Sequence, residues 1–403
     1  MTSSLKNKTL RAVLYLHFLS ALVADDRLFL KQAKTLENKT IAGRSIKFIS
    51  GDVIFTKGNL ILNCQEGRHY EKNDLAVLYK KVSAIQEQRT LTCDTIKFFS
   101  KEDRLLSIGS SHILDPDYDL KADSITVFTK QDSGVALGNV ILKQKGQTIK
   151  ANRIEYQKDK DQDGVSYTAI GDVIIEDSLR IATCGKAKYD RKNEVTTLEV
   201  EPKITEDERV LSGEKIILQY NKEELERLHI PKKAFAVTPI EGFQRSRSDS
   251  TEIGDTLKYA DRMEGSQLTS YFENGKLDSL RIVGMAKTLY HVFEDSIYQG
   301  KNNASGDTII MMFMENELNT LKIIGGSEGK YIPDSVANDV DHPVIYSANY
   351  IKYRLKDDES DFQGKVKIKH DRTDLDAGFV SVNWQNNLLN ALPRMVSDTI
   401  SEP

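Results

Sequence analysis

The chain has 403 residues, of which 39% are hydrophobic and 29% are charged, and its 56 basic and 60 acidic residues give a net charge of −4 at pH 7. This composition is typical of a folded chain rather than a disordered one, and the near balance of charge gives no electrostatic case for a nucleic-acid partner. Only 8 residues are proline, which suits long hydrogen-bonded β-ladders because proline removes a backbone donor.

The N-terminus has the features of an export signal. Three basic side chains (Lys6, Lys8 and Arg11) precede an apolar run over 12–24, and an acidic pair follows it directly. We expect residues 1–24 to be a signal peptide, with a buried N-terminal helix as the alternative. The apolar run is too short to span a bilayer, which takes about 20 helical residues.

A short pattern recurs ten times: apolar, any, small, polar or Gly, any, apolar, any, apolar. Its copies start at 62, 91, 120, 149, 182, 211, 263, 304, 346 and 375, and the commonest step is 29 residues. The small position holds Cys64, Cys93, Ala122, Ala151, Cys184, Gly213, Gly265, Gly306, Ala348 and Ala377. Such a period, with apolar residues at alternate positions, is typical of stacked β-units that bury their apolar faces against one another.

A glycine stands 11 residues before several copies and is followed by a strand-like segment. These glycines are Gly51, Gly109, Gly138, Gly171 and Gly364. Because glycine tolerates a positive φ, we expect each to mark a turn or a β-bulge. Short polar turns are expected at 57–59, 145–147 and 161–164.

The second half has longer units, and the chain divides accordingly. We expect a first β-segment over 25–230 with a lead strand or cap near its start, a second over 231–392 with longer repeats, and a frayed tail over 393–403. Pro231, Pro239 and the polar run after 244 predict a loop near 231–250. Residues 221–228 have helical propensity, but their register within the repeat predicts a turn and a strand.

The three cysteines all occupy the small position of the repeat. We expect them to act as small apolar core residues. A disulfide between Cys64 and Cys93, which lie on successive units, is the alternative. No CxxC spacing for a metal or redox site is present.

No set of catalytic residues stands out. The fourth repeat position is mostly polar, with Asp94, Asp123, Asn152, Glu214, Asp307 and Asn349. Stacked units could align these side chains as a calcium site or a polysaccharide-lyase cleft, but Gly185 and Gly378 at the same position favour a structural corner. The seven histidines are scattered, and Trp384 in the last repeat is expected in the core or as an end cap. We expect no catalytic residue, no metal site and no cofactor.

The inward positions of the stack are the candidate functional residues. If the two walls of the stack pack tightly, these residues form only a core. If the walls splay into a V, the same residues line an apolar trough for acyl chains, with charged head groups outside. The candidates for trough lining are Ile96, Phe98, Ile125, Val127, Val140, Leu142, Ile154, Tyr156, Val173, Ile175, Ile216 and Leu218.

The repeat unit resembles the OstA-like family, which comprises a periplasmic lipopolysaccharide-transport protein and the N-terminal domain of its outer-membrane partner. Residues 138–156 and 171–189 carry the resemblance best; it covers 45–230 well and 231–390 more loosely. The family implies an all-β fold: an elongated, V-shaped β-jellyroll stack of about ten repeats, here in two consecutive segments. With about twice the repeats of a short family member and no following barrel, the chain is expected to be a stand-alone, extended member.

The resemblance also implies partners and a location. The ligand would be lipopolysaccharide or lipid A, and other OstA-like β-jellyroll proteins would join the open ends of the stack, from an inner-membrane transport complex to an outer-membrane translocon. The protein would work in the periplasm or peripherally at the outer membrane. Two alternatives to a lipid-conducting bridge stay open: an envelope docking scaffold with a closed, dry core, and an exported carbohydrate-active β-stack.

Overall fold

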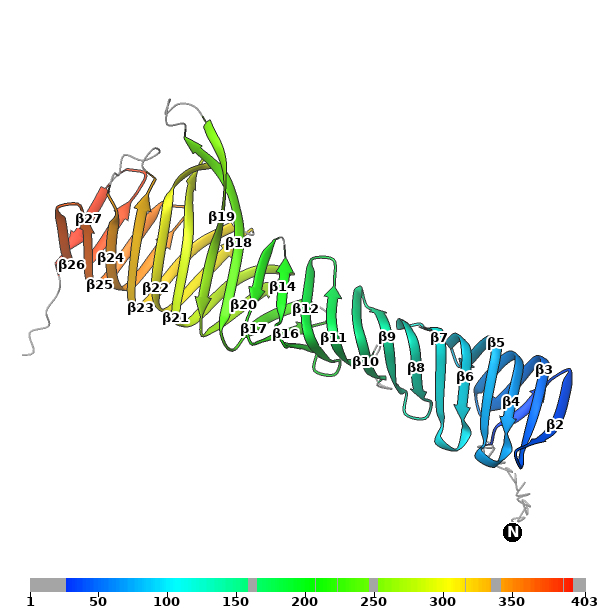
Figure 1. Cartoon of the computed structure of the whole chain (residues 1–403). Helices are drawn as coiled ribbons and strands as arrows, with labels where there is room; N and C mark the ends of the chain where they lie inside the picture. Colours follow the sequence, from blue (N-terminus) through cyan, green and yellow to red (C-terminus); the bar gives the residue numbers. More distant parts are fainter. Residues whose placement is uncertain are drawn as a thin grey trace, which may run out of the picture.

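The computed structural model of the chain describes residues 27–158, 165–206, 208–222, 224–245, 253–315, 317–334, 342–386 and 388–393. The expected signal peptide, the turn at 161–164 and all but the first residue of the expected tail lie outside these ranges. The described residues form strands joined by turns, and their only helical elements are two 3-10 turns, η1 (Glu71–Asn73) and η2 (Ser100–Glu102). The molecule is a long, narrow stack with its first strands at one end and its last at the other (Figure 1). The expected all-β, elongated fold is confirmed.

The strands cross the long axis of the stack one after another. The first half contains β1 (Phe29–Gln32), β2 (Thr35–Ile41), β3 (Arg44–Lys57), β4 (Leu60–Tyr70), β5 (Leu75–Gln86), β6 (Arg89–Phe99), β7 (Arg104–Asp115), β8 (Tyr118–Phe128), β9 (Ser133–Gln144), β10 (Gln147–Lys158), β11 (Val165–Glu176), β12 (Arg180–Asp190), β13 (Val195–Glu199), β14 (Lys203–Glu206), β15 (Arg209–Ser212), β16 (Lys215–Asn221) and β17 (Glu224–Ile230). The second half contains β18 (Ala234–Arg245), β19 (Ile253–Gly265), β20 (Gln267–Glu273), β21 (Lys276–Glu294), β22 (Ile297–Met314), β23 (Glu317–Pro333), β24 (Val344–Arg354), β25 (Glu359–His370), β26 (Thr373–Asn383) and β27 (Leu388–Leu392).

From β3 to β12 each strand pairs antiparallel with the next, and each pair has a break in register near its middle. Between β7 and β8, for example, Gly109 and Ser110 together lie opposite the single residue Asp123. Both bulged residues have positive φ, 78° at Gly109 and 39° at Ser110. The expected bulge glycines are confirmed, since Gly51, Gly138, Gly171 and Gly364 have φ between 72° and 81°.

The row of bulges divides the sheet lengthwise, because a bulge bends its strand and sharpens the local twist. We call this row the spine. The half-strands that lead from the spine to the turns at 58–59, 87–88, 116–117 and 145–146 form wall A. The half-strands that lead to the turns at 71–74, 100–103 and 129–132 form wall B. The two rows of turns, which we call the rim, lie opposite the spine.

The second half continues the same stack with longer strands. β21, β22 and β23 have 19, 18 and 17 residues, against 11 or 12 in β5 to β12. β17 confirms that the segment with helical propensity is a turn and a strand. β1 and β2 occupy the region expected to hold a lead strand. The division into two segments at residue 230 stays a prediction.

The loop expected near 231–250 is wrong for residues 234–245. They form β18, which pairs with β15 through Phe235–Val237 and with β19 along most of its length. Pro239 lies beyond the end of the pairing with β15, so its missing N–H costs no ladder hydrogen bond on that side. Residues 246–252 lie outside the described part of the chain.

One continuous cluster of buried apolar side chains extends from Leu28 to Val382. Cys64 and Cys184 belong to it and Cys93 packs against it, half-buried. All three thiols are free, so the core role of the cysteines is confirmed and the alternative bridge between Cys64 and Cys93 is not formed.

Candidate functional site

The interior between the two walls is the candidate site, and the twelve predicted residues all point into it. Val140, Leu142, Val173 and Ile175 lie on wall A, and the other eight lie on wall B. Each belongs to the buried cluster, with an exposed fraction between 0 and 9%. In this conformation the interior is therefore closed.

Each inward row changes character at the rim. Because side chains alternate between the faces of a strand, inward residues recur every second position from the spine. On wall A these rows end in Lys57, Gln86, Asp115 and Gln144, and on wall B they end in Ser100, Thr129 and Lys158. The row Ile154, Tyr156, Lys158 is an example: two apolar side chains, then an ammonium group. The cross-section is thus apolar at depth and polar at its upper edge.

Ion pairs join the two walls across this edge. Lys57 Nζ on wall A lies 2.6 Å from Asp103 Oδ1 on wall B, and it also donates to the backbone carbonyl of Ser100. Arg89 Nη1 on wall A lies 3.1 Å from Asp132 Oδ1 on wall B. We call the set Lys57, Arg89, Asp103, Asp115, Asp132 and Lys158 the rim latch.

Asp115 holds the centre of the rim latch. It lies on wall A, where it accepts from Arg89 Nε at 3.0 Å, and Lys158 Nζ reaches it from wall B at 3.1 Å. Lys158 also pairs with Asp117 at 2.9 Å. The side chain of Asp115 is only 3% exposed, so these partners compensate a carboxylate that is almost removed from water.

The pKa of Asp115 records this balance. Burial raises the pKa of its carboxyl. The backbone N–H of Asp117 and the cations of Arg89 and Lys158 lower that pKa by more than burial raises it, so the net pKa lies below the ordinary value. The pKa of the Lys158 ammonium is raised: burial lowers it, but hydrogen bonds to Asp117 and Asp115 outweigh that effect. Both groups are therefore charged at neutral pH.

Two buried hydroxyl groups lie in the inward rows beneath these charges. Tyr118 on wall A and Tyr156 on wall B are 3% and 5% exposed, and their ring centroids are 6.1 Å apart. Neither hydroxyl has a hydrogen-bond partner. Arg89 Cζ lies 6.0 Å from the centroid of the Tyr118 ring. An unpaired buried hydroxyl is costly, so the pair marks a place where a polar ligand group would be favoured.

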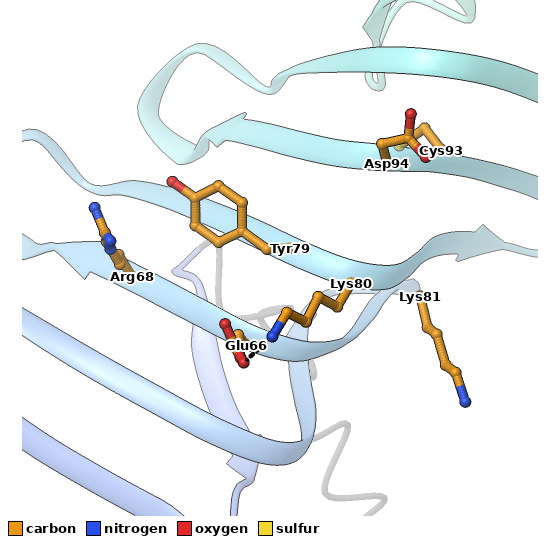
Figure 2. A pocket seen from close by; sticks show the side chains of 7 residues that line it. All are labelled: Glu66, Arg68, Tyr79, Lys80, Lys81, Cys93 and Asp94. Carbon is orange, nitrogen blue, oxygen red and sulfur yellow. Dashed lines mark hydrogen bonds and ion pairs between the residues drawn. The ribbon is translucent and has the colours of Figure 1, made fainter.

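A hollow of about 680 Å³ lies at the corner between β4, β5 and β6 and is lined by Glu66, Arg68, Tyr79, Lys80, Lys81, Cys93 and Asp94. Figure 2 shows Lys80 directed at Glu66, to which its Nζ is bonded at 2.6 Å. Lys80 has a φ of 62° where other units have a bulge glycine. None of the twelve predicted residues lines this hollow, so it is separate from the apolar interior.

A second polar cluster lies in the second half of the stack. His291 Nδ1 on β21 lies 2.8 Å from Asp261 Oδ1 on β19, and the His291 ring stacks on Tyr259 at 4.4 Å between centroids. Burial raises the pKa of Asp261, and the hydrogen bonds from His291 reduce this effect without cancelling it. The repeat pattern does not reveal this pair, because the two residues are 30 positions apart in units of irregular length.

The polar residues of the fourth repeat position are corner residues. A Cβ added to Gly109, Gly138 or Gly325 would lie 2.1–2.3 Å from a carboxylate oxygen of Asp94, Asp123 or Asp307, respectively. Each of these side chains therefore covers the bulge glycine of the next strand, and the structural interpretation of this position is confirmed. The described residues contain no group of three or more His, Cys, Asp or Glu side chains that could hold a metal ion.

The repeat pattern predicts the inward apolar residues but not the rim latch. A signal was available for part of it: Lys57 and Lys158 each follow two inward apolar positions at the same alternate spacing, and Asp115 follows the inward Ile113. Which cation meets which carboxylate follows only from how the two walls approach each other. Among the described residues, no helix has the length and hydropathy needed to cross a membrane.

Comparisons with known proteins show a similarity over part of the chain. Residues 119–224 match the family model described as LptA/(LptD N-terminal domain) LPS transport protein. No curated protein matches the sequence. Among solved structures, the chain is similar to the crystal structure of LptH, the LptA homologous periplasmic component of the lipopolysaccharide transport device from Pseudomonas aeruginosa. That similarity has 20% identity and a TM-score of 0.25, and it covers 27% of this chain and 79% of that one. Over residues 119–224, the resemblance to the OstA-like lipopolysaccharide-transport family is confirmed.

Proposed function

We propose that this protein is a non-catalytic component of lipopolysaccharide transport in the periplasm, and that its interior carries the acyl chains of lipid A along the stack. The observation that carries the proposal is the coincidence of the family match with the apolar interior. Ten of the twelve predicted lining residues lie within the matched segment 119–224, all except Ile96 and Phe98.

The cross-section suits an amphiphile. From Ser111 near the spine to Asp115 at the rim, the inward row is four residue steps long, about 13 Å at ~3.3 Å per residue. In this row Ile113 lies between the buried Ser111 and the charged Asp115, and in the row of wall B that ends in Lys158 the side chains of Ile154 and Tyr156 lie below the ammonium group. Acyl chains placed between the walls would replace contacts between apolar side chains, while a phosphorylated head group would remain at the rim beside water.

The ends of the stack favour docking of further β-units. β2 is exposed along its whole length at one end, and β27 is exposed along its whole length at the other. Leu36, Ile41, Leu388 and Leu392 are large apolar side chains on these end strands, each at least half exposed. Unpaired strand edges recruit further strands. We propose that other OstA-like β-jellyroll proteins, or further copies of this chain, join here between the inner and outer membranes.

A docking scaffold with a closed core is the second candidate, and the closed interior favours it. None of the twelve lining residues is more than 9% exposed, so the described conformation leaves the acyl chains no free volume along these residues. Lipid transport therefore requires the walls to separate, and a scaffold does not.

Native mass spectrometry of the protein purified from a Gram-negative periplasm tests the proposal. We expect bound lipopolysaccharide, lost in Ile125→Asp, whose side chain is buried on wall B. The matched control is Ile108→Asp, because Ile108 lies on the adjacent strand and is 39% exposed. Circular dichroism must show a folded sheet in both variants. A folded wild-type protein that neither retains nor takes up lipid A would favour the scaffold.

A further inference from the structure

The rim latch closes the interior along the segment from Lys57 to Lys158. Three hydrogen bonds made by its cations join residues 43 positions apart: Lys57 to the Ser100 carbonyl, Arg89 to Asp132 and Lys158 to Asp115. Forty-three residues are about one and a half 29-residue units, so each contact starts on one wall and ends on the other. A fourth crossing joins Gln144 to the backbone of Val165, with a Val165 N–H donating to Oε1 at 3.1 Å.

We propose that the rim latch is a gate, and that phosphate groups of a bound amphiphile open it by replacing its carboxylates. The inference rests on the function proposed above and names the head-group site. Arg89 and Lys158 would exchange Asp132 and Asp115 for phosphate oxygens, and Lys57 would do the same with Asp103. The unpaired hydroxyls of Tyr118 and Tyr156 would then donate to the ester or amide carbonyls that join acyl chains to the head group.

In this exchange each cation replaces a carboxylate partner with a phosphate partner, and no charge is left unpaired in a dry interior. Guanidinium and ammonium groups bind phosphate with the same charge-assisted hydrogen bonds that they now make to carboxylates. Asp115 is buried only while the walls are closed, so their separation returns its carboxylate to water rather than leaving it unpaired in a dry interior. The hydroxyl groups of Tyr118 and Tyr156 gain more than the cations do, because the cations exchange one hydrogen-bond partner for another, whereas the hydroxyl groups have no partner in the closed state.

Two sets of variants separate a gate from a merely structural contact. Asp115→Asn keeps the volume and removes the competing charge, so it should tighten lipid A binding several-fold. Arg89→Gln with Lys158→Gln removes the phosphate ligands, so it should weaken lipid A binding about tenfold or more. The same double variant should bind dephosphorylated lipid A as well as the wild type does, or better, because the latch is also gone.

The binding assay uses the full chain with lipid A, dephosphorylated lipid A and phosphatidylglycerol, whose phosphate comes from another class of lipid. Preference for lipid A over phosphatidylglycerol in the wild type, lost in the double variant, identifies lipid A as the source of the phosphate. Comparable loss for both lipids identifies a general phospholipid site and supports the gate equally. The control is Lys150→Gln with Glu176→Gln, an exposed ion pair of 3.0 Å on β10 and β11.

A distance measurement keeps the gate testable if a latch variant is unstable. Spin labels at Asn59→Cys and Lys101→Cys lie in turns on opposite sides of the rim, in a background with Ala at the three native cysteines. We expect lipid A to lengthen the distance between them. An unchanged distance with bound lipid A, or equal lipid A affinity in the wild type and the Arg89/Lys158 variant, would overturn the gate and leave the transport function standing. Absence of lipid A binding to every variant would instead overturn the proposed function.

Discussion

Asp123 on β8 covers the α-carbon of Gly138 on β9: a Cβ built on Gly138 would lie 2.3 Å from Asp123 Oδ2. Gly138 has a φ of 76°, and the Asn139 side chain that follows it donates to the same carboxylate at 3.0 Å. The contact recurs as Asn152 over Gly171. A polar side chain on one strand and a glycine on the next thus build these corners of the spine.

Replacing this glycine should destabilise the stack. Gly138→Ala would impose the cost of a positive φ, about 1–2 kcal/mol, together with the overlap against Asp123. Gly146→Ala is the matched control, because Gly146 has a φ of 75° and nothing within 4 Å of its added Cβ. Urea unfolding of both variants should show a loss at least ~1 kcal/mol larger for Gly138→Ala. Equal losses would mean that the corner contact contributes no stability.

The repeat pattern predicted these corners because glycine and a small residue recur at fixed positions. Both residue types are required there by the local backbone geometry of the bulge. It also predicted which side chains point inward, since alternation along a strand is a local property. Two corners depart from the pattern. On β5, Lys80 stands where other units have a bulge glycine. At β12 the glycine is Gly185, and Val200, with a φ of 65°, occupies the bulge position; a Cβ on Gly185 would lie 2.7 Å from Val200 Cγ1. The glycine has moved to the opposite strand, which keeps the corner compact.

The closed state of the interior could not be predicted, because an open trough and a packed core need the same inward residues. The rim latch was out of reach for a related reason. Arg89 and Asp132 are separated by 43 positions, and their contact depends on the angle between the walls rather than on any local pattern. The prediction of a loop around Pro239 was wrong because the pairing with β15 ends before this residue. The position of a proline in the sequence does not show where a neighbouring strand stops pairing.

The cysteines should be unreactive in the folded protein. Burial raises the pKa of the Cys64, Cys93 and Cys184 thiols to about 11, so almost no thiolate is present at pH 8. Iodoacetamide labelling followed by mass spectrometry should show slow modification of Cys93, which is half-buried, and slower modification of the other two. In urea all three should react at the rate of a free thiol. A Cys64–Cys93 disulfide in the purified protein would contradict this prediction.

Acid should weaken the rim latch through Asp115. Its pKa is below the ordinary value of about 3.9, so the folded state binds fewer protons than the unfolded state. The stability that it contributes is fully present above the unfolded pKa and is lost as the pH falls through the folded pKa.

We therefore expect Asp115→Asn to be less stable than the wild type at pH 7, with a difference that shrinks as the pH falls below about 4. Thermal unfolding at several pH values measures this difference. Glu176→Gln provides the comparison, because its pair with Lys150 is exposed and should contribute little at any pH. A difference for Asp115→Asn that stayed constant down to pH 2 would show that its charge does not hold the rim.

The end strands should control assembly. A lysine on an exposed strand edge opposes pairing with another strand, because its charge would be desolvated in the joint. Leu36→Lys on β2 and Leu389→Lys on β27 should therefore reduce concentration-dependent association in sedimentation velocity. Ile181→Lys is the control: Ile181 is also about half exposed, but its strand, β12, lies within the stack.

Trp384, the only tryptophan of the chain, gives an independent signal at the C-terminal end. It lies directly after β26, it is 55% exposed, and its indole N–H donates to Ser360 Oγ at 2.8 Å. A unit docked on β27 would exclude water from this ring, so its emission should shift to shorter wavelength as the protein concentration rises. The shift should disappear in Leu389→Lys and persist in Ile181→Lys. An association that both end-strand variants retain would place the contact on the sides of the stack instead of its ends.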